Sequence, residues 1–280
     1  MADPLAAIRA RYAAEIMIWA RRAGLPTERV EAAFRTVPRE RYLPPPPWRL
    51  GPPRRPQDAS DTFDPSDLYA DVLVVLDGAR GINNGQPSLH AAWMAGVDPG
   101  RGETVVQVGI GTGYYTAILA ELVGRSGRVE AYEIEPGLAE QARRNLAGLP
   151  QVAVHAASGL GVALPEADVV YVSAGATMPD AAWLRALRPG GRLVFPWQPF
   201  GRHGEAMSIR RRPGGLAVRL HGSVSFMRCV GPDGPEMECG ASPQPRPAGE
   251  TRSAWLVADL TPDETATAVG REVWLSAREA

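Results

Sequence analysis

The sequence predicts an α/β protein whose sheet is mostly parallel, has helices on both faces and ends in an antiparallel hairpin. Short apolar runs alternate with helical patterns between residues 104 and 195, which is typical of parallel strands joined by helices. The stretch Thr104–Thr116 reads as a buried strand, a glycine-rich turn and the start of a helix. Beyond residue 200 the helical patterns stop, and Gly214-Gly215 can form a hairpin turn.

Composition narrows the class of protein. The chain has 280 residues, of which 45% are hydrophobic and 22% are charged, as in ordinary globular proteins. A net charge of −1 creates no overall field that attracts nucleic acid or a membrane surface, so we expect neither partner. Cys229 and Cys239 lack metal-ligand spacing, so we expect reduced thiols and no metal. Because neither a secretory signal nor a membrane-length apolar run is visible, we expect a cytoplasmic protein.

The first part of the chain predicts helices followed by a loop. Residues 5–23 carry apolar side chains at every fourth position, as an amphipathic helix does; these are Ile8, Tyr12, Ile16 and Ala20. A second helix is expected from Thr27, as its N-cap, to about Arg35. The remaining expected elements are a proline-rich surface loop at residues 44–66, an extended segment at 68–76 and a helix beginning near Ser88.

The central part predicts the alternating strands and helices of the sheet. The expected strands are residues 104–108, 128–132, 152–155, 169–172 and 192–195, and the expected helices are residues 114–123, 136–146 and 180–187. Segments 206–209, 216–220 and 224–230 are expected to form the antiparallel end. A segment rich in proline and glycine then runs to Pro247. The apolar pieces at 254–258 and 272–275 form either an added hairpin or a contact with a partner.

The glycine turn itself indicates a ligand. Glycines at alternate positions, Gly109, Gly111 and Gly113, let a ligand approach the backbone, and the helix start favours a negatively charged group. A dinucleotide site has the spacing G-x-G-x-x-G, whereas G-x-G-x-G is typical of S-adenosylmethionine methyltransferases. Glu133 ends the next strand and can accept both ribose hydroxyls, with Glu135 as the adjacent alternative. The other interpretation is a tight turn without a ligand.

Several blocks of sequence, in order, resemble the protein-L-isoaspartate O-methyltransferase family over roughly residues 30–231. The matching blocks are VPRERYLP (Val37–Pro44), YAD (Tyr69–Asp71), GQPSLHA (Gly85–Ala91), VVQVGIGTGYYTAILAELVG (Val105–Gly124), VEAYEIEP (Val129–Pro136) and LRPGGRLVFP (Leu187–Pro196). The resemblance implies a Rossmann-like class I methyltransferase with a seven-stranded sheet. It implies methylation of a protein or peptide carboxylate, usually that of an isoaspartyl residue, with S-adenosyl-L-methionine as donor and S-adenosyl-L-homocysteine as product.

The resemblance also implies the site. The cofactor-binding candidates are Gln107, Gly109, Gly111, Gly113, Glu133, Ser158 and Gly159. The candidates for positioning the acceptor are Asn84, Gly85, Gln86, Ser88 and His90, and no residue is assigned with certainty to catalysis. His90 either orients the substrate carboxylate or is a satisfied, partly buried histidine. Asp71 and Tyr69 are expected to brace the loop over the site.

Three positions depart from the family pattern. Gly85 stands where the family usually has a hydroxyl residue, Gln107 replaces an acidic residue of the first strand, and Ser158 replaces an aspartate expected near the adenine. These departures keep two further interpretations open. One is a tailoring methyltransferase that acts on an aspartate of a ribosomal peptide or on a small molecule, and the other is an inactive module that binds the cofactor.

The expected domain organisation has three parts. Residues 1–95 form an N-terminal helical extension with the substrate and cofactor loop. Residues 96–231 form the core that binds S-adenosylmethionine, and residues 232–280 form a C-terminal extension. The sequence leaves the oligomeric state open.

Overall fold

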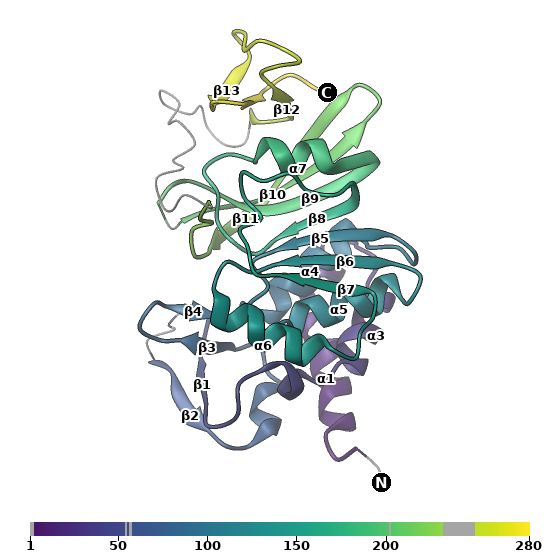
Figure 1. Ribbon diagram of the computed structural model, residues 1–280, viewed down its shortest axis with the longest axis vertical. Coiled ribbons are helices and arrows are strands. Elements are labelled where there is room, and N and C mark those ends of the chain that lie inside the picture. The colour runs from purple at the N-terminus through teal and green to yellow at the C-terminus, as the bar shows by residue number, and fades with distance from the viewer. Residues whose placement is uncertain (1–2, 54, 56–57, 202, 232–249) are drawn as a thin grey trace. The chain divides into compact units, whose positions relative to one another are not determined.

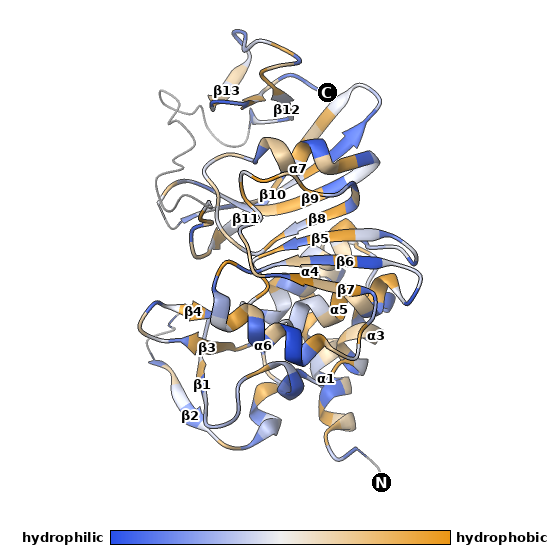
Figure 2. Ribbon diagram, viewed as in Figure 1, coloured by the Kyte–Doolittle hydropathy of each residue, from blue (hydrophilic) through white to orange (hydrophobic). Residues whose placement is uncertain are grey.

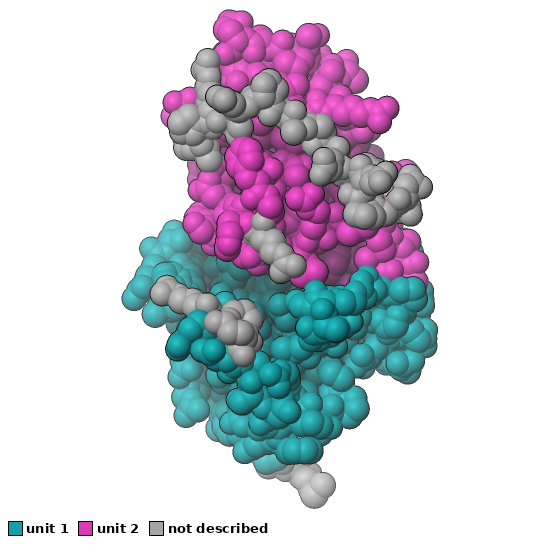
Figure 3. All heavy atoms as spheres, turned by 90° about the vertical axis from the view of Figure 1, so that its left-hand side faces the viewer, with its two compact units in different colours: residues 1–103, 110–131, 135–155 teal, residues 104–109, 132–134, 156–280 magenta. Residues whose placement is uncertain are grey.

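The computed structural model describes residues 3–53, 55, 58–201, 203–231 and 250–280. The chain divides into two compact units (Figure 3). Unit 1 comprises residues 1–103, 110–131 and 135–155, and unit 2 comprises residues 104–109, 132–134 and 156–280. Cys239 and the expected proline- and glycine-rich segment up to Pro247 lie outside the described residues. The three expected domains, whose boundaries follow a different criterion, stay a prediction.

Unit 1 combines helices with a small antiparallel sheet (Figure 1). Its elements are α1 (Ala6–Ile16), α2 (Ile18–Arg22), α3 (Glu28–Thr36), the 3-10 turn η1 (Arg39–Tyr42), β1 (Trp48–Gly51), β2 (Ser60–Thr62), the 3-10 turn η3 (Pro65–Leu68), β3 (Leu73–Asp77), β4 (Ile82–Asn83), α4 (Pro87–Val97), α5 (Tyr114–Val123), β6 (Arg128–Tyr132, whose last residue belongs to unit 2), α6 (Pro136–Leu146) and β7 (Val152–His155). The small sheet has the order β2-β1-β3-β4.

The N-terminal helices follow the apolar periodicity. The helix expected over residues 5–23 is present as two pieces that separate at Met17, and Tyr12, Ile16 and Ala20 are buried as predicted. The helix α3 has Thr27 at its N-cap position, although the side chain of Thr27 makes no capping hydrogen bond. Of the predicted apolar positions of the first helix, only Ile8 remains partly exposed.

The prediction of a surface loop over residues 44–66 is wrong. Strands β1 and β2 lie in this stretch, and β1 pairs with both β2 and β3. Trp48 is buried in a cluster with Leu43, Leu68 and Val74, and its indole N–H donates to the carbonyl oxygen of Pro44 at 2.8 Å. The prolines disguised a short strand, because a single large aromatic ring supplies the apolar area that the composition lacks.

The described residues of unit 2 form strands of a second, larger sheet and helix α7. Its elements are β5 (Thr104–Val108), β8 (Ala167–Val172), α7 (Ala181–Ala186), β9 (Leu187–Phe200), β10 (His203–Arg212), β11 (Gly215–Ser225), β12 (Ser253–Leu256), β13 (Ala266–Val269) and β14 (Val273–Ser276). Within this unit the strands follow the order β13-β14-β12-β11-β10-β9-β8-β5. The pairs β5–β8 and β8–β9 are parallel, and the pairs from β9 onward are antiparallel.

The α/β class is confirmed, and the antiparallel part is larger than the expected hairpin. Strand β12 pairs with β11 through Leu216 opposite Ala254, so the tail extends the sheet. Residues 188–191 form an irregularity within β9, where the register against β8 shifts between Leu187 and Arg192. A strand can cross such a shift when it keeps its partner on both sides, which a local pattern does not reveal.

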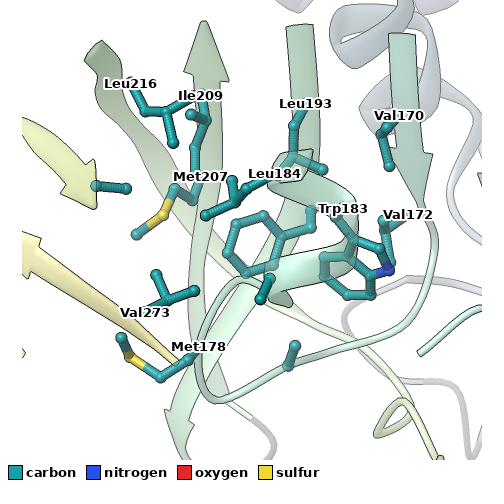
Figure 4. Close-up of a cluster of buried hydrophobic side chains, with 14 of the residues drawn as sticks. Val170, Val172, Met178, Trp183, Leu184, Leu193, Met207, Ile209, Leu216 and Val273 are labelled. Atoms are coloured by element: carbon teal, nitrogen blue, oxygen red, sulfur yellow. The ribbon is translucent and has the colours of Figure 1, made fainter. Parts of the chain in front are cut away.

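A continuous apolar core lies in unit 2 (Figure 4). Val170 and Val172 of β8 are buried with Trp183 and Leu184 of α7 and with Met207 of β10. The tail contributes to the same core, since Leu275 of β14 belongs to it. The alternating apolar side chains of the strands thus explain why α7 packs on β8 and β9.

Two helices of unit 1 match their expected bounds. Helices α5 and α6 cover residues 114–123 and 136–146, as the sequence predicts. Helix α6 buries Ala139, Ala142 and Leu146 and exposes charged residues, and both hydrophobic (orange) and hydrophilic (blue) residues are visible along it in Figure 2. The strand–turn–helix at Thr104–Thr116 is therefore present as β5, the glycine turn and the start of α5.

Candidate active site

The first of the predicted cofactor-binding residues, Gln107, lies on β5 in unit 2. Gln107 is only 1% exposed and stands opposite Tyr171 in the parallel pair β5–β8. Among the described residues, its side-chain oxygen Oε1 accepts no hydrogen bond. Burying an oxygen atom without a hydrogen-bond donor costs about 1–3 kcal/mol of stability. A ligand that donates a hydrogen bond to this atom would remove that cost.

The turn after β5 brings three of the predicted residues together in unit 2. Gly109 has a φ of 76°, and its N–H donates to the carbonyl oxygen of Tyr132 at 2.9 Å. Glu133, which follows Tyr132, is 6% exposed. A Cβ on Gly159 would lie 2.6 Å from Cγ2 of Val108 and 3.2 Å from Cβ of Tyr132. Gly159 therefore has to be a glycine, because the chain passes directly over the ends of the two strands.

The other two glycines of the turn lie in unit 1. Gly111 and Gly113 have φ values of 57° and 94°, which residues other than glycine rarely adopt. A Cβ on Gly113 would lie 2.8 Å from Cδ1 of Leu146, and one on Gly111 would lie 3.2 Å from Cδ1 of Leu76. Gly113 is the N-cap of α5. The spacing G-x-G-x-G thus follows from backbone conformation and from packing at once.

The side chain of Ser158 makes hydrogen bonds with backbone groups of the protein. Its hydroxyl donates to the carbonyl oxygen of Val230 at 2.7 Å, and the hydroxyl oxygen of Ser158 accepts from the N–H of Leu160 at 3.0 Å. The side chain therefore ties the loop after β7 to residue 230. Its expected contact with an adenine stays a prediction.

These residues fit S-adenosylmethionine. The free amide oxygen of Gln107 suits the ammonium group of an amino acid, and the buried carboxyl group of Glu133 suits a ribose diol. The positive-φ glycines leave the backbone open to close approach. Gln107 and Glu133 thus offer hydrogen-bond acceptors that suit the ammonium group and the ribose hydroxyls of this ligand.

The acceptor block, defined as residues 84–90, is held by Asp71 in unit 1. One carboxylate oxygen of Asp71 accepts from the N–H of Ser88 at 2.8 Å. The other accepts from the hydroxyl of Ser88 and from the amide of Gln86, both at 2.7 Å. Asp71 therefore braces the start of α4, as expected, and the side chains of Gln86 and Ser88 serve this bracing.

Asn84 is held by a buried arginine that the sequence analysis did not single out. The oxygen Oδ1 of Asn84 accepts from the N–H of Val74 at 2.9 Å and from the guanidinium of Arg39 at 3.2 Å. Arg39 is fully buried, and it also donates to the carbonyl oxygens of Leu68, Ala70 and Val72. Its position within the block VPRERYLP was the signal that could have identified it.

The side chain of His90 lies directly against Gly85. A Cβ on Gly85 would lie 2.3 Å from Nε2 of His90, so the imidazole fills the space that a side chain at position 85 would need. The ring of His90 stacks on Tyr115 at 3.7 Å between centroids, and the hydroxyl of Tyr115 donates to the carbonyl oxygen of Gly85 at 3.1 Å. Gly85, His90 and Tyr115 therefore form a single packed group.

The imidazole of His90 is neutral. Burial, and to a smaller extent the positive charge of Arg39, lowers the pKa of His90 from 6.5 to about 3. The ring is 1% exposed. At neutral pH it therefore offers one nitrogen that donates and one that accepts hydrogen bonds.

Comparison with known proteins decides the family. A sequence model of the family described as "Protein-L-isoaspartate(D-aspartate) O-methyltransferase (PCMT)" matches residues 57–233. The chain belongs to this family. A protein-L-isoaspartate O-methyltransferase of Methanopyrus kandleri is 32% identical over 215 residues, covering 74% of this chain and 86% of the relative. One of Aeropyrum pernix is 35% identical over 202 residues, covering 70% and 68%.

Solved structures show the fold of the family. A protein-L-isoaspartate O-methyltransferase matches with a TM-score of 0.66 at 22% identity, covering 96% of this chain and 88% of that one. A Plasmodium falciparum protein solved in complex with S-adenosyl-L-homocysteine matches with a TM-score of 0.61 at 17% identity, covering 78% and 97%. These structures show that the chain has the class I fold, and its membership of the family shows that it is a methyltransferase that depends on S-adenosylmethionine.

The described residues contain neither a metal-ligand cluster nor a membrane-spanning helix. No group of three or more His, Cys, Asp or Glu side chains is arranged to hold a metal ion in this part of the chain. None of the helices described is long and apolar enough to cross a membrane.

Proposed function

We propose that the protein transfers a methyl group from S-adenosylmethionine to the free carboxylate of an isoaspartyl residue in proteins or peptides. The observation that carries the proposal is the family match over residues 57–233, which includes the acceptor block and the glycine turn. The relatives described above carry the name of this activity. Their names are the reason to place isoaspartate first among carboxylate acceptors.

The cofactor supplies an electrophilic methyl group when it is bound. Gln107 and Glu133 fix its position, Gln107 by accepting a hydrogen bond at Oε1 and Glu133 by accepting from ribose hydroxyls. The turn Gly109–Gly113 admits it to the backbone. Since the two acceptors are buried, each hydrogen bond is stronger than it is in water.

The acceptor needs no general base. A carboxylate has a pKa near ~4 and is already ionised at neutral pH. The protein therefore only has to hold the attacking oxygen in line with the methyl group, and positioning of this kind supplies most of the rate. The rigid acceptor block, braced by Asp71 and Arg39, suits this task.

The lack of a side chain at Gly85 is compatible with this acceptor. The nitrogen Nε2 of His90 stands where that side chain would begin, so a polar atom remains at the position. A neutral imidazole can donate to a carboxylate as a hydroxyl does. We assign to His90 the role of orienting the acceptor.

A labelled-methyl assay tests the proposal. The purified protein is incubated with methyl-labelled S-adenosylmethionine and a pair of peptides that differ only in carrying isoaspartate or aspartate at one position. We expect base-labile methyl ester on the isoaspartyl peptide and little on the aspartyl peptide. Preferential labelling of the aspartyl peptide would favour the tailoring alternative, and labelling of neither peptide would contradict the proposal.

A further inference from the structure

Two buried oxygen atoms of unit 2 lack hydrogen-bond partners among the described residues. One is Oε1 of Gln107, and the other is the hydroxyl oxygen of Ser173, which follows β8. Native proteins leave few buried polar atoms unsatisfied, because each costs about 1–3 kcal/mol. A common ligand explains both.

The two side chains lie on the same face of the sheet. Gln107 stands opposite Tyr171 in the parallel pair β5–β8. Ser173 is two residues beyond Tyr171, and its N–H still donates to the carbonyl oxygen of Val108 at 2.8 Å, so the pairing continues to that point. Because side chains alternate along a strand, Gln107, Tyr171 and Ser173 share one face.

Ser173 also borders the glycine turn. A Cβ on Gly109 would lie 3.5 Å from the carbonyl carbon and oxygen of Ser173, which is ordinary contact. The site is at the carboxyl ends of parallel strands, where ligands bind in open α/β sheets. The hydroxyl of Ser173 and the amide of Gln107 therefore belong to one small region of unit 2.

We propose that Ser173 binds the amino-acid end of S-adenosylmethionine together with Gln107. The ammonium group donates to Oε1 of Gln107, and the hydroxyl of Ser173 donates to the carboxylate. A hydroxyl that donates to a carboxylate forms a charge-assisted bond, which restores part of the attraction that a neutral Gln107 lacks. The inference rests on the proposed function, because the ligand is the methyl donor.

Calorimetry with two ligands tests the assignment on the full chain. S-adenosylhomocysteine has the amino-acid end, and 5′-methylthioadenosine lacks it. For Ser173→Ala we expect affinity for S-adenosylhomocysteine to fall about 10-fold to 100-fold, with unchanged affinity for 5′-methylthioadenosine. Ser173→Thr keeps the hydroxyl and should retain most of the affinity.

Matched variants separate binding from folding. Glu133→Ala should weaken both ligands, because the ribose is common to them. Ser208→Ala removes an exposed hydroxyl from β10 of the same sheet, where it contacts His221, and should change neither affinity. The melting temperature of ligand-free Ser173→Ala should equal or exceed that of the wild type, since the lost hydroxyl has no partner in the described protein. A structural serine would lower it.

The outcomes distinguish the two proposals. If the wild type binds S-adenosylhomocysteine and Ser173→Ala binds it equally tightly, the assignment of Ser173 is wrong and the proposed function stands. An equal loss of affinity for both ligands would also overturn the assignment. If the wild type does not bind S-adenosylhomocysteine at all, the proposed function fails and the inference fails with it.

Discussion

At the scale of single residues, the polar side chains of the acceptor block mostly serve one another. Gln86 and Ser88 contact Asp71, and Asn84 contacts Arg39. Residue type alone made each of these a candidate for touching substrate. These side chains therefore hold the block in place, and their hydrogen bonds are internal to the protein.

The neutral state of His90 has a measurable consequence for stability. Burial lowers the pKa of His90 from its ordinary value of 6.5 to about 3. Between pH 6.5 and pH 3, His90 is therefore protonated in the unfolded chain but not in the folded protein. The free energy of unfolding is therefore unaffected by the titration of His90 above pH 6.5, and it decreases as the pH falls from 6.5 toward 3. At pH 5 the loss relative to pH 7 should be about 2 kcal/mol.

Urea unfolding at pH 7 and pH 5 measures this effect. His90→Gln removes the titrating group and leaves the other ionisable groups in place, so it should lose about 2 kcal/mol less than the wild type between the two pH values. Comparing each protein with itself cancels any overall change in stability that the substitution causes. An identical loss in both proteins would mean that His90 is not buried as a neutral ring.

At the scale of secondary-structure elements, the local sequence pattern predicted helices correctly, because the hydrogen bonds of a helix join residues that are close in the chain. Helices α5 and α6 have the bounds that their periodicity predicts. Strand β1 was missed, because its stability comes from one tryptophan packed on distant residues. The proline-rich composition around it argued for a loop, and tertiary packing overrode that preference.

The buried position of Trp48 predicts a large cost of removal. Trp48→Ala should lower the free energy of unfolding by about 3–5 kcal/mol, as for other large aromatic residues in cores. Trp19→Ala is the control, because Trp19 is 50% exposed on α2 and contacts only Arg22 among the aromatic–cation pairs described. It should cost about 1 kcal/mol or less. Equal effects in denaturant melts would show that residues 48–51 do not form part of a core.

At the scale of the whole molecule, the tail is part of the architecture of unit 2. Strand β14 pairs with β12, and β12 pairs with β11, so these tail strands continue the sheet that contains β5, β8 and β9. Leu275 is fully buried in the core of this unit. The sequence left open whether these residues make a hairpin or contact a partner, and the pairing favours the former.

A substitution in the tail tests its role in stability. Leu275→Ala should lower the free energy of unfolding by about 2–5 kcal/mol. Glu279→Ala changes a side chain that is 82% exposed in the same tail, and it should alter stability by about 0.5 kcal/mol or less. If thermal unfolding of the Leu275→Ala protein matches that of the wild type, the tail contributes nothing to the core of unit 2.

The sequence by itself determined the strand–turn–helix around Gly109–Gly113, the identity of the methyl donor and the family of the chain. These features depend on residues close together in the chain, whose spacing limits backbone conformation directly. Only the tertiary structure decided that the imidazole of His90 fills the side-chain space of Gly85, that Ser173 shares a face with Gln107, and that the tail joins the sheet. Each of these depends on how side chains pack or strands pair in space, which local periodicity does not encode.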